Sequence, residues 1–542
     1  MRLLRDLRFF EAARTVLGRL QTVLQNMESR DFYATRLETL ALGVELADIS
    51  QQTDGGATQL ANITERVEKH CSELLASKEE VSPALSLLLH CIHLATYRGF
   101  PASESAVSTV QKMLPEASAS LAELLEAFFH PAADGHQLLA LVQIIEAARN
   151  HEDIAFDLKQ VAVAARRFLD TQVSEDNAHA VILAIEVLAE HAIRGSFTGR
   201  GDSGFTSLGI TWERAAKLST LGYRILALGL GEKGRLVRVS IVDGKLEELV
   251  VEEEGLSSAQ ALKEWSRRFP YDYSRLEDPN EFWTSTEGLR LGISTLLPTI
   301  VVMDTQLQQL PPNLIRLGQD FAGRMVPVAS APSISWLAAS CNSPTPAKSR
   351  RSAWIPTGTG QQEDIALVWL AERLQECLDE HGFLLDRDTA IPNGLGDSEL
   401  AVVVAHGALL PEERFIQRIS GSEHLAMYPE TLASAVAGSS VVILFICSGG
   451  RVDSHPQAQT TVGLVKQLLD RGCTSVVASP WPLDVKIPPR WLPSFLRRWS
   501  EGDAVIDAVY RANADVAAAF GGDPVDCLAM NLFGNPLWKR SQ

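Results

Sequence analysis

A run of six consecutive apolar residues, Val441–Ile446, ends in Cys447, Ser448 and two glycines. An unbroken apolar run of this length, rich in β-branched residues, predicts a strand buried on both faces of a parallel sheet. The two glycines indicate that the chain turns sharply after the strand. Because open α/β folds bind their ligands beyond the carboxyl ends of the strands, this pattern makes Cys447 a candidate functional residue.

A second apolar run, Leu400–Ala405, ends in His406 and Gly407. Neighbouring strands with these ends bring an imidazole and a thiol to the same edge of the sheet. An adjacent imidazole converts a thiol to the reactive thiolate, and backbone amides at Gly407 and Gly449–Gly450 can stabilise an oxyanion. We interpret the pair as a site of acyl transfer. The alternative is a buried structural cysteine and a histidine that closes a strand.

Composition argues against several classes of protein, among them nucleic-acid binders and membrane proteins. A chain of 542 residues suggests two to four domains, and its net charge of -18 argues against a general binder of nucleic acids or anionic membranes. Seven cysteines without regular spacing predict reduced thiols. No run approaches the ~20 apolar residues of a membrane span, and the amino terminus lacks the apolar core of a signal peptide. We therefore predict a cytoplasmic protein with no membrane and no direct nucleic-acid partner.

The apolar pattern divides the chain into a helical part and a mixed part. Over residues 1–195, apolar positions recur every three or four residues in about eight blocks, which predicts an all-helical, repeat-like domain. Residues 196–220 are rich in glycine and serine and predict a linker, or else a mobile or cleavable segment. Residues 221–542 alternate strands with helices, which predicts an α/β domain with a mainly parallel sheet. We expect it to open with a meander of strands at Arg224–Leu230, Arg235–Val242 and Lys245–Glu252, with a hairpin turn at Asp243-Gly244. Beyond the meander, the pattern predicts helices at Ser257–Arg267, Pro279–Leu297 and near Pro312–Leu317, and a strand at Thr299–Met303.

Two sequence patterns resemble functional motifs, but we do not interpret either as a binding site. Gly229–Gly234 matches the GxGxxG pattern, but a strand follows it instead of the helix that dinucleotide binding requires. His70 with Cys71, and His90 with Cys91 and His93, lie in apolar helical runs without carboxylates, so core packing is favoured over a metal site. We predict no metal site and no cofactor.

Six blocks within residues 221–542 resemble, in the same order, the CHAT domain. This domain is a caspase-like member of the clan of cysteine peptidases that includes separase, caspases and gingipains. The blocks contain the strand with its Leu-Pro end, the Ala-Pro-Ser block, the histidine strand, the cysteine strand, the tryptophan-containing strand end and the closing Gly-Asn-Pro. They are Thr299–Leu314, Val328–Ser335, Val404–Gly407, Ile446–Gly450, Ser479–Asp484 and Phe533–Pro536.

The resemblance implies a caspase-like α/β fold and a cysteine endopeptidase that cleaves a protein or peptide substrate. It implies Cys447 as nucleophile, His406 as general base and then acid, and the amides of Gly407 and Cys447 as oxyanion donors. The cysteine block departs from the family pattern, because Ile446 replaces an alanine and the late glycine is Gly450. This departure bears on substrate preference more than on the chemistry.

The resemblance also makes Asp484 and Asp453 candidate substrate-binding residues, since related peptidases read a basic side chain with an acid at this edge. The alternative for each is an ordinary loop aspartate or a helix cap. Trp481 either lines the same pocket or packs beneath it.

The family resemblance further implies a peptidase that is latent until a regulatory protein or signal binds the helical domain, as in bacterial defence or programmed cell death. The rival function is a catalytically silent scaffold that acts through protein–protein interactions. A serine acyl transferase is disfavoured because no serine lies on a suitable nucleophile elbow.

Overall fold

The computed structural model describes most of the chain, and it divides into two compact units. One unit comprises residues 1–131, 144–161 and 456–458, and the other comprises 132–143, 162–455 and 459–542. The predicted fold class is confirmed, since helices precede an α/β part with a mostly parallel sheet. The described residues are 10–25, 30–51, 57–97, 100–101, 103–113, 135–147, 154–190, 207–232, 234–252, 290–291, 296–318, 320–342, 348–358, 363–409, 417–420, 426–454 and 461–540.

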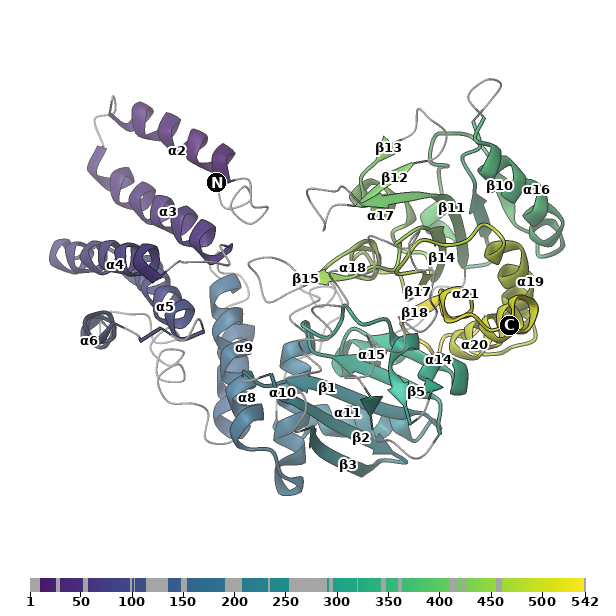
Figure 1. The fold of residues 1–542 in the computed structure, drawn as a ribbon, viewed down its shortest axis with the longest axis horizontal. Coiled ribbons are helices and arrows are strands. Elements are labelled where there is room, and N and C mark those ends of the chain that lie inside the picture. The colour runs from purple at the N-terminus through teal and green to yellow at the C-terminus, as the bar shows by residue number, and fades with distance from the viewer. Residues whose placement is uncertain are drawn as a thin grey trace. The chain divides into compact units, whose positions relative to one another are not determined.

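The first unit is helical throughout its described residues (Figure 1). Apolar residues spaced three or four apart on each helix form its core, as Leu60, Ile63 and Val67 do. Burial raises the pKa of Cys71 and that of Cys91 to about 12, so both thiols are unreactive packing groups. The helices are α2 (Phe10–Leu24), α3 (Arg30–Gln51), α4 (Ala57–Ser77), α5 (Ser82–Tyr97) and α6 (Glu104–Met113).

The second unit is built on one large sheet. Unbroken apolar runs form its central strands, which are buried on both faces. Its main strands are β1 (Arg224–Leu230), β2 (Leu236–Val242), β3 (Lys245–Glu252), β5 (Thr299–Met303), β8 (Val328–Ala331), β9 (Arg351–Trp354), β10 (Leu384–Asp386), β11 (Leu400–Leu409), β14 (Val441–Ile446), β17 (Ser475–Ala478) and β18 (Asn531–Gly534). Shorter strands are β4 (Arg290–Leu291), β6 (Arg316–Leu317), β7 (Asp320–Phe321), β12 (Gln417–Ser420), β13 (Ala426–Met427), β15 (Asp453–Ser454) and β16 (Thr461–Val462).

The sheet contains two parallel groups that run in opposite directions. Its strand order is β10-β9-β11-β14-β17-β18-β8-β5-β1-β2-β3 (Figure 1). Strands β10, β9, β11, β14 and β17 are mutually parallel. Strand β18 is antiparallel to β17 and parallel to β8, and β8 continues parallel to β5 and β1. The carboxyl ends of the two groups therefore lie at opposite edges of the sheet.

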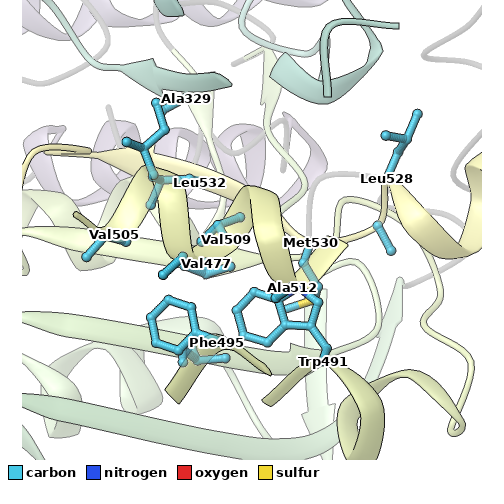
Figure 2. Close-up of a cluster of buried hydrophobic side chains, with 14 of the residues drawn as sticks. Ala329, Val477, Trp491, Phe495, Val505, Val509, Ala512, Leu528, Met530 and Leu532 are labelled. Atoms are coloured by element: carbon cyan, nitrogen blue, oxygen red, sulfur yellow. The ribbon is translucent and has the colours of Figure 1, made fainter. Parts of the chain in front are cut away.

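Helices pack onto this sheet through large apolar side chains. Trp491, Phe495 and Trp499 stack along one face of a helix, and Phe445 of β14 meets Trp491 edge-on at 5.9 Å. Figure 2 shows part of this core. The helices that lie wholly or partly in the second unit are α8 (Gly135–Ala147), α9 (Ile154–Thr171), α10 (Ala178–Glu190), α11 (Ile210–Ser219), α14 (Ala322–Met325), α15 (Ile334–Asn342), α16 (Ile365–Glu380), α17 (Pro429–Val436), α18 (Leu464–Asp470), α19 (Ile487–Ser500), α20 (Val505–Phe520) and α21 (Pro524–Cys527).

Buried charged groups attach helices α9 and α10 to the part of the second unit that contains strands β8, β5 and β1. Arg166 of α9 donates to Asp304 Oδ1 at 2.7 Å, just beyond the end of β5. Glu186 of α10 accepts from the amides of Ile334 and Ser335 in the first turn of α15, at 2.7 and 2.8 Å. Complete burial raises the pKa of Glu186. Residues 162–190, which the sequence pattern assigns to the helical domain, thus pack within the second unit.

Several local predictions differ from the structure. Ile210–Ser219, inside the predicted linker, forms α11 because Ala215 and Leu218 bury one face against β1 and β2. Arg290–Leu291, inside a predicted helix, pairs with β6 as a short strand. A helix predicted near Pro312–Leu317 is a single 3-10 turn followed by β6. The helix predicted at residues 257–267 lies outside the described residues.

The predicted meander of β1, β2 and β3 is confirmed. Its second turn places Asp243 and Gly244 at φ values of 48° and 74°, as a two-residue Asp-Gly hairpin requires. Among the helices described, none is both long and apolar enough to cross a membrane.

Candidate active site

Cys447 follows the last residue of β14, and His406 lies in β11 where the parallel pairing of β11 with β14 ends; β11 itself continues to Leu409, beyond the predicted end of this strand, and pairs there with β12. Strands β11 and β14 pair in register up to Ala405 opposite Ile446, and the two candidate residues come next. Adjacent strands lie about 4.8 Å apart, and side chains at matched positions leave the same face. Both residues are partly exposed, in contrast to the buried strands that precede them. The two strands that the hypothesis requires to be neighbours are therefore paired with each other.

The turn that carries Cys447 has an unusual backbone. Ser448 is buried and has a φ of 58°, a left-handed conformation that non-glycine residues rarely adopt. The amide of Gly449 donates back to Ile446 O at 2.9 Å, and the amide of Arg451 donates to Ser448 O at 3.1 Å. Such strained residues concentrate at functional sites, because the surrounding structure must hold them in place.

The loop after β17 holds this turn and reaches the sulfur itself. Two backbone hydrogen bonds join it to the turn, from Ser448 to Trp481 O at 3.1 Å and from Gly450 to Ser479 O at 2.8 Å. The amide of Leu483 faces Cys447 Sγ at 3.4 Å. The loop after β17 therefore contacts both the turn and the Cys447 sulfur.

Asp364 joins the site from the loop after β9, the other neighbour of β11. Its Oδ2 lies 2.8 Å from His406 Nε2. Its Oδ1 accepts from the amide of Leu367 at 2.9 Å, so the same side chain caps α16. Partial burial opposes ionisation, but the hydrogen bonds from Leu367, His406 and Ala366 outweigh it and lower the pKa of Asp364. Asp364 is therefore a carboxylate at neutral pH.

The contact between Asp364 and His406 is not predicted from the sequence. The only local signal is an aspartate immediately before an apolar helical run, which predicts a helix cap. Strand β9, with the sequence Arg-Ser-Ala-Trp, is too short to show a periodic pattern. Without that strand, nothing in the sequence placed Asp364 beside His406.

Gly407 packs directly against the end of β14 and the first residue of the turn that follows it. A Cβ atom at this position would lie 2.0 Å from Cys447 O and 2.8 Å from Ile446 Cγ2. We expect Gly407→Ala to lower the free energy of unfolding by about 1–3 kcal/mol, because neither backbone can move without disturbing the sheet. Urea unfolding followed by tryptophan fluorescence measures this loss.

Gly209→Ala is the matched control for Gly407→Ala. Gly209 belongs to the same unit, has a φ of -83°, and offers an added Cβ only ordinary contacts at 3.7 Å and beyond. We expect it to unfold within about 0.5 kcal/mol of the wild type. Equal stabilities of the two variants would show that the strand ends do not constrain each other.

The three predicted substrate-binding residues, Trp481, Asp484 and Asp453, differ in their surroundings. Trp481 is fully buried and donates its indole N–H to Val525 O at 2.9 Å, so it packs beneath the edge of the sheet. Asp484 Oδ1 accepts from the amide of Lys486 at 2.9 Å, an Asx turn just before α19. Asp453 begins the short strand β15, and its side chain lies outside the described part of the chain. In the described part, no group of three or more His, Cys, Asp or Glu side chains is placed to hold a metal ion.

No protein-family model and no curated protein matches this chain. Among solved structures, it is similar to Saccharomyces cerevisiae separase in a separase–securin complex, with a TM-score of 0.48 and 10% identity over 96% of this chain. The chain spans about half (48%) of that separase chain. It is also similar to Porphyromonas gingivalis RgpB, with a TM-score of 0.31 and 12% identity over 53% of this chain and 71% of the other. Similarities at these levels assign no activity to this chain.

Proposed function

We propose that this chain is a CHAT-type cysteine endopeptidase with Cys447 as nucleophile and His406 as its general base. The observation that carries the proposal is the assembly of Asp364, His406 and Cys447 at one edge of three adjacent strands. The amide that faces the sulfur and the strained turn after it give further support. The six sequence blocks described above support the same class.

The proposed reaction proceeds in two steps. His406 takes the thiol proton, and the Cys447 thiolate attacks the carbonyl carbon of the scissile peptide bond. The amides of Gly407 and Cys447 are the proposed donors to the oxyanion. The protonated His406 then gives its proton to the departing amine, which leaves a thioester on the sulfur. Water, deprotonated by the same imidazole, hydrolyses the thioester and releases the acid.

Asp364 is the proposed positioning residue for His406. Its bond to Nε2 fixes the ring and leaves Nδ1 as the nitrogen for proton exchange with Cys447. A carboxylate in this place also stabilises the imidazolium that forms during the reaction. Asp364 thus acts through His406 and not on the substrate.

Because Asp364 also caps α16, its substitution needs a variant that separates the two roles. Serine is a good helix cap but is too short to reach His406. We expect Asp364→Ser to lower kcat by about 10²–10⁴-fold with little change in KM or in melting temperature. Asp364→Ala is expected to lose the same activity and a further ~1 kcal/mol of stability. A kcat unchanged in Asp364→Ser would remove Asp364 from the mechanism.

The helical unit is the proposed site of regulation, in keeping with the family resemblance. In this proposal a protein partner or signal binds that unit and activates a latent peptidase, in a role such as bacterial defence or programmed cell death. Comparison of cleavage by the full chain before and after addition of lysates from stressed cells tests the latency.

New amino termini in a proteome-derived peptide library test the proposed activity. We expect the full chain to generate them and Cys447→Ala to generate none. Equal sets of cleavages from the two proteins would leave the scaffold function, in which the fold acts only through protein–protein contacts.

A further inference from the structure

Lys486, at the start of α19, lies between two carboxylates. Its Nζ is 2.8 Å from Asp526 Oδ2 and 3.4 Å from Asp484 Oδ2. The ammonium also lies over the Phe520 ring, 5.1 Å from its centroid. The hydrogen bond to Asp526 outweighs desolvation and raises the pKa of Lys486, so its charge persists at neutral pH. Asp526 is nearly buried, with 10% of its side chain exposed, and it depends on this ammonium for its counter-charge.

This group is connected to the candidate nucleophile through the loop after β17. Leu483 directs its amide at Cys447 Sγ over 3.4 Å, and Asp484 is the following residue. Standard bond lengths therefore keep the Asp484 Cα within about 9 Å of the sulfur. A peptide with its scissile bond at Cys447 presents its flanking side chains to this loop. Lys486 thus belongs to the same loop that contacts the sulfur.

We infer that Lys486 determines specificity in the proposed peptidase, by occupying Asp484 and Asp526 and selecting against lysine or arginine beside the scissile bond. The inference rests on the proposed function. A substrate cation would have to displace Lys486 from a nearly buried carboxylate or else lie beside a like charge. An uncharged side chain meets neither penalty, and the exposed side chain of Val485 offers it an apolar contact.

Lys486→Met tests this inference because it keeps an unbranched apolar stem over Phe520 and removes only the charge. The two carboxylates then lack their ammonium and attract a substrate cation in its place. We expect kcat/KM for lysine and arginine peptides, relative to leucine and methionine peptides, to rise at least about tenfold, which corresponds to about 1.4 kcal/mol. The double variant Lys486→Met/Asp526→Asn is expected to lose most of that gain.

Lys466→Met is the matched control. Lys466 forms a comparable pair with Asp470 within α18, at 2.6 Å. We expect this variant to keep the wild-type preference. Lys486→Gln, which retains a donor for the carboxylates, serves as a second variant in case methionine unfolds the protein, and a smaller shift in the same direction is expected.

The peptide library gives outcomes that separate this inference from the proposed function. A wild-type preference for lysine or arginine would overturn the inference, as would an unchanged preference in a folded, active Lys486→Met. In both cases the cleavage still depends on Cys447, so the peptidase function stands. Absence of Cys447-dependent cleavage by the wild type would overturn both.

Discussion

Cys447→Ala is expected to abolish peptide cleavage, with a loss of at least about 10⁴-fold in kcat. In the proposed mechanism the thioester forms on Cys447, so the remaining activity is that of binding and the oxyanion donors alone. His406→Ala is expected to lose about 10²–10⁴-fold, because the thiol keeps its intrinsic nucleophilicity but lacks a base. Initial rates on one cleaved peptide, with circular dichroism to confirm folding, measure both losses.

Cys341→Ala is the control for these variants. Cys341 is an exposed residue, but desolvation of its thiol by neighbouring groups raises the pKa of that thiol to about 11. It lies at the end of α15, away from the strands that carry the dyad, and we expect its replacement to leave kcat unchanged. If Cys341→Ala were inactive and Cys447→Ala active, the assignment of the nucleophile would be wrong.

Asp304→Ala is expected to cause the largest loss of stability. Asp304 is fully buried and receives hydrogen bonds from the Arg166 guanidinium and from the amides of Leu230 and Gln306. Its removal leaves Arg166 as an uncompensated buried charge and leaves two amides without their acceptor. We expect a loss of about 3–5 kcal/mol in the free energy of unfolding, measured in urea.

The double variant Arg166→Met/Asp304→Leu identifies the cause of that loss. It removes both charges and is expected to recover much of the stability, because a buried ion pair can be replaced by apolar groups of similar volume. Glu501→Gln, in an exposed pair with Arg498, is expected to change stability by less than about 1 kcal/mol. If Asp304→Ala were as mild as Glu501→Gln, the pair would not fix α9 to the sheet.

The strands that the sequence predicts best are those with unbroken or alternating apolar runs. Strands β1, β3 and β5 have the predicted bounds, and β14 ends immediately before Cys447. The two apolar runs also predict that β11 and β14 are buried on both faces, whereas their pairing with each other is seen only in the structure.

The structural features that the sequence does not predict depend on contacts between residues far apart in the chain. Strand β18 has four residues and joins the two parallel groups, yet no local pattern marks its role. Asp364 meets His406 across 42 residues, and Lys486 meets Asp526 across 40, only once the strand order is known. Helix α10 is apolar on all sides, which indicates burial, but its packing against the sheet becomes visible only in the structure.

The most direct test asks whether Cys447 is a nucleophile activated by His406. The full chain is treated with a peptide acyloxymethylketone and then measured intact by mass spectrometry. We expect one added inhibitor group, mapped to Cys447, and its loss in both Cys447→Ala and His406→Ala. The reagent requires a thiolate activated by its histidine, so a merely exposed cysteine does not react in this way. Modification that is absent from Cys447, or equal in His406→Ala and wild type, would contradict the account.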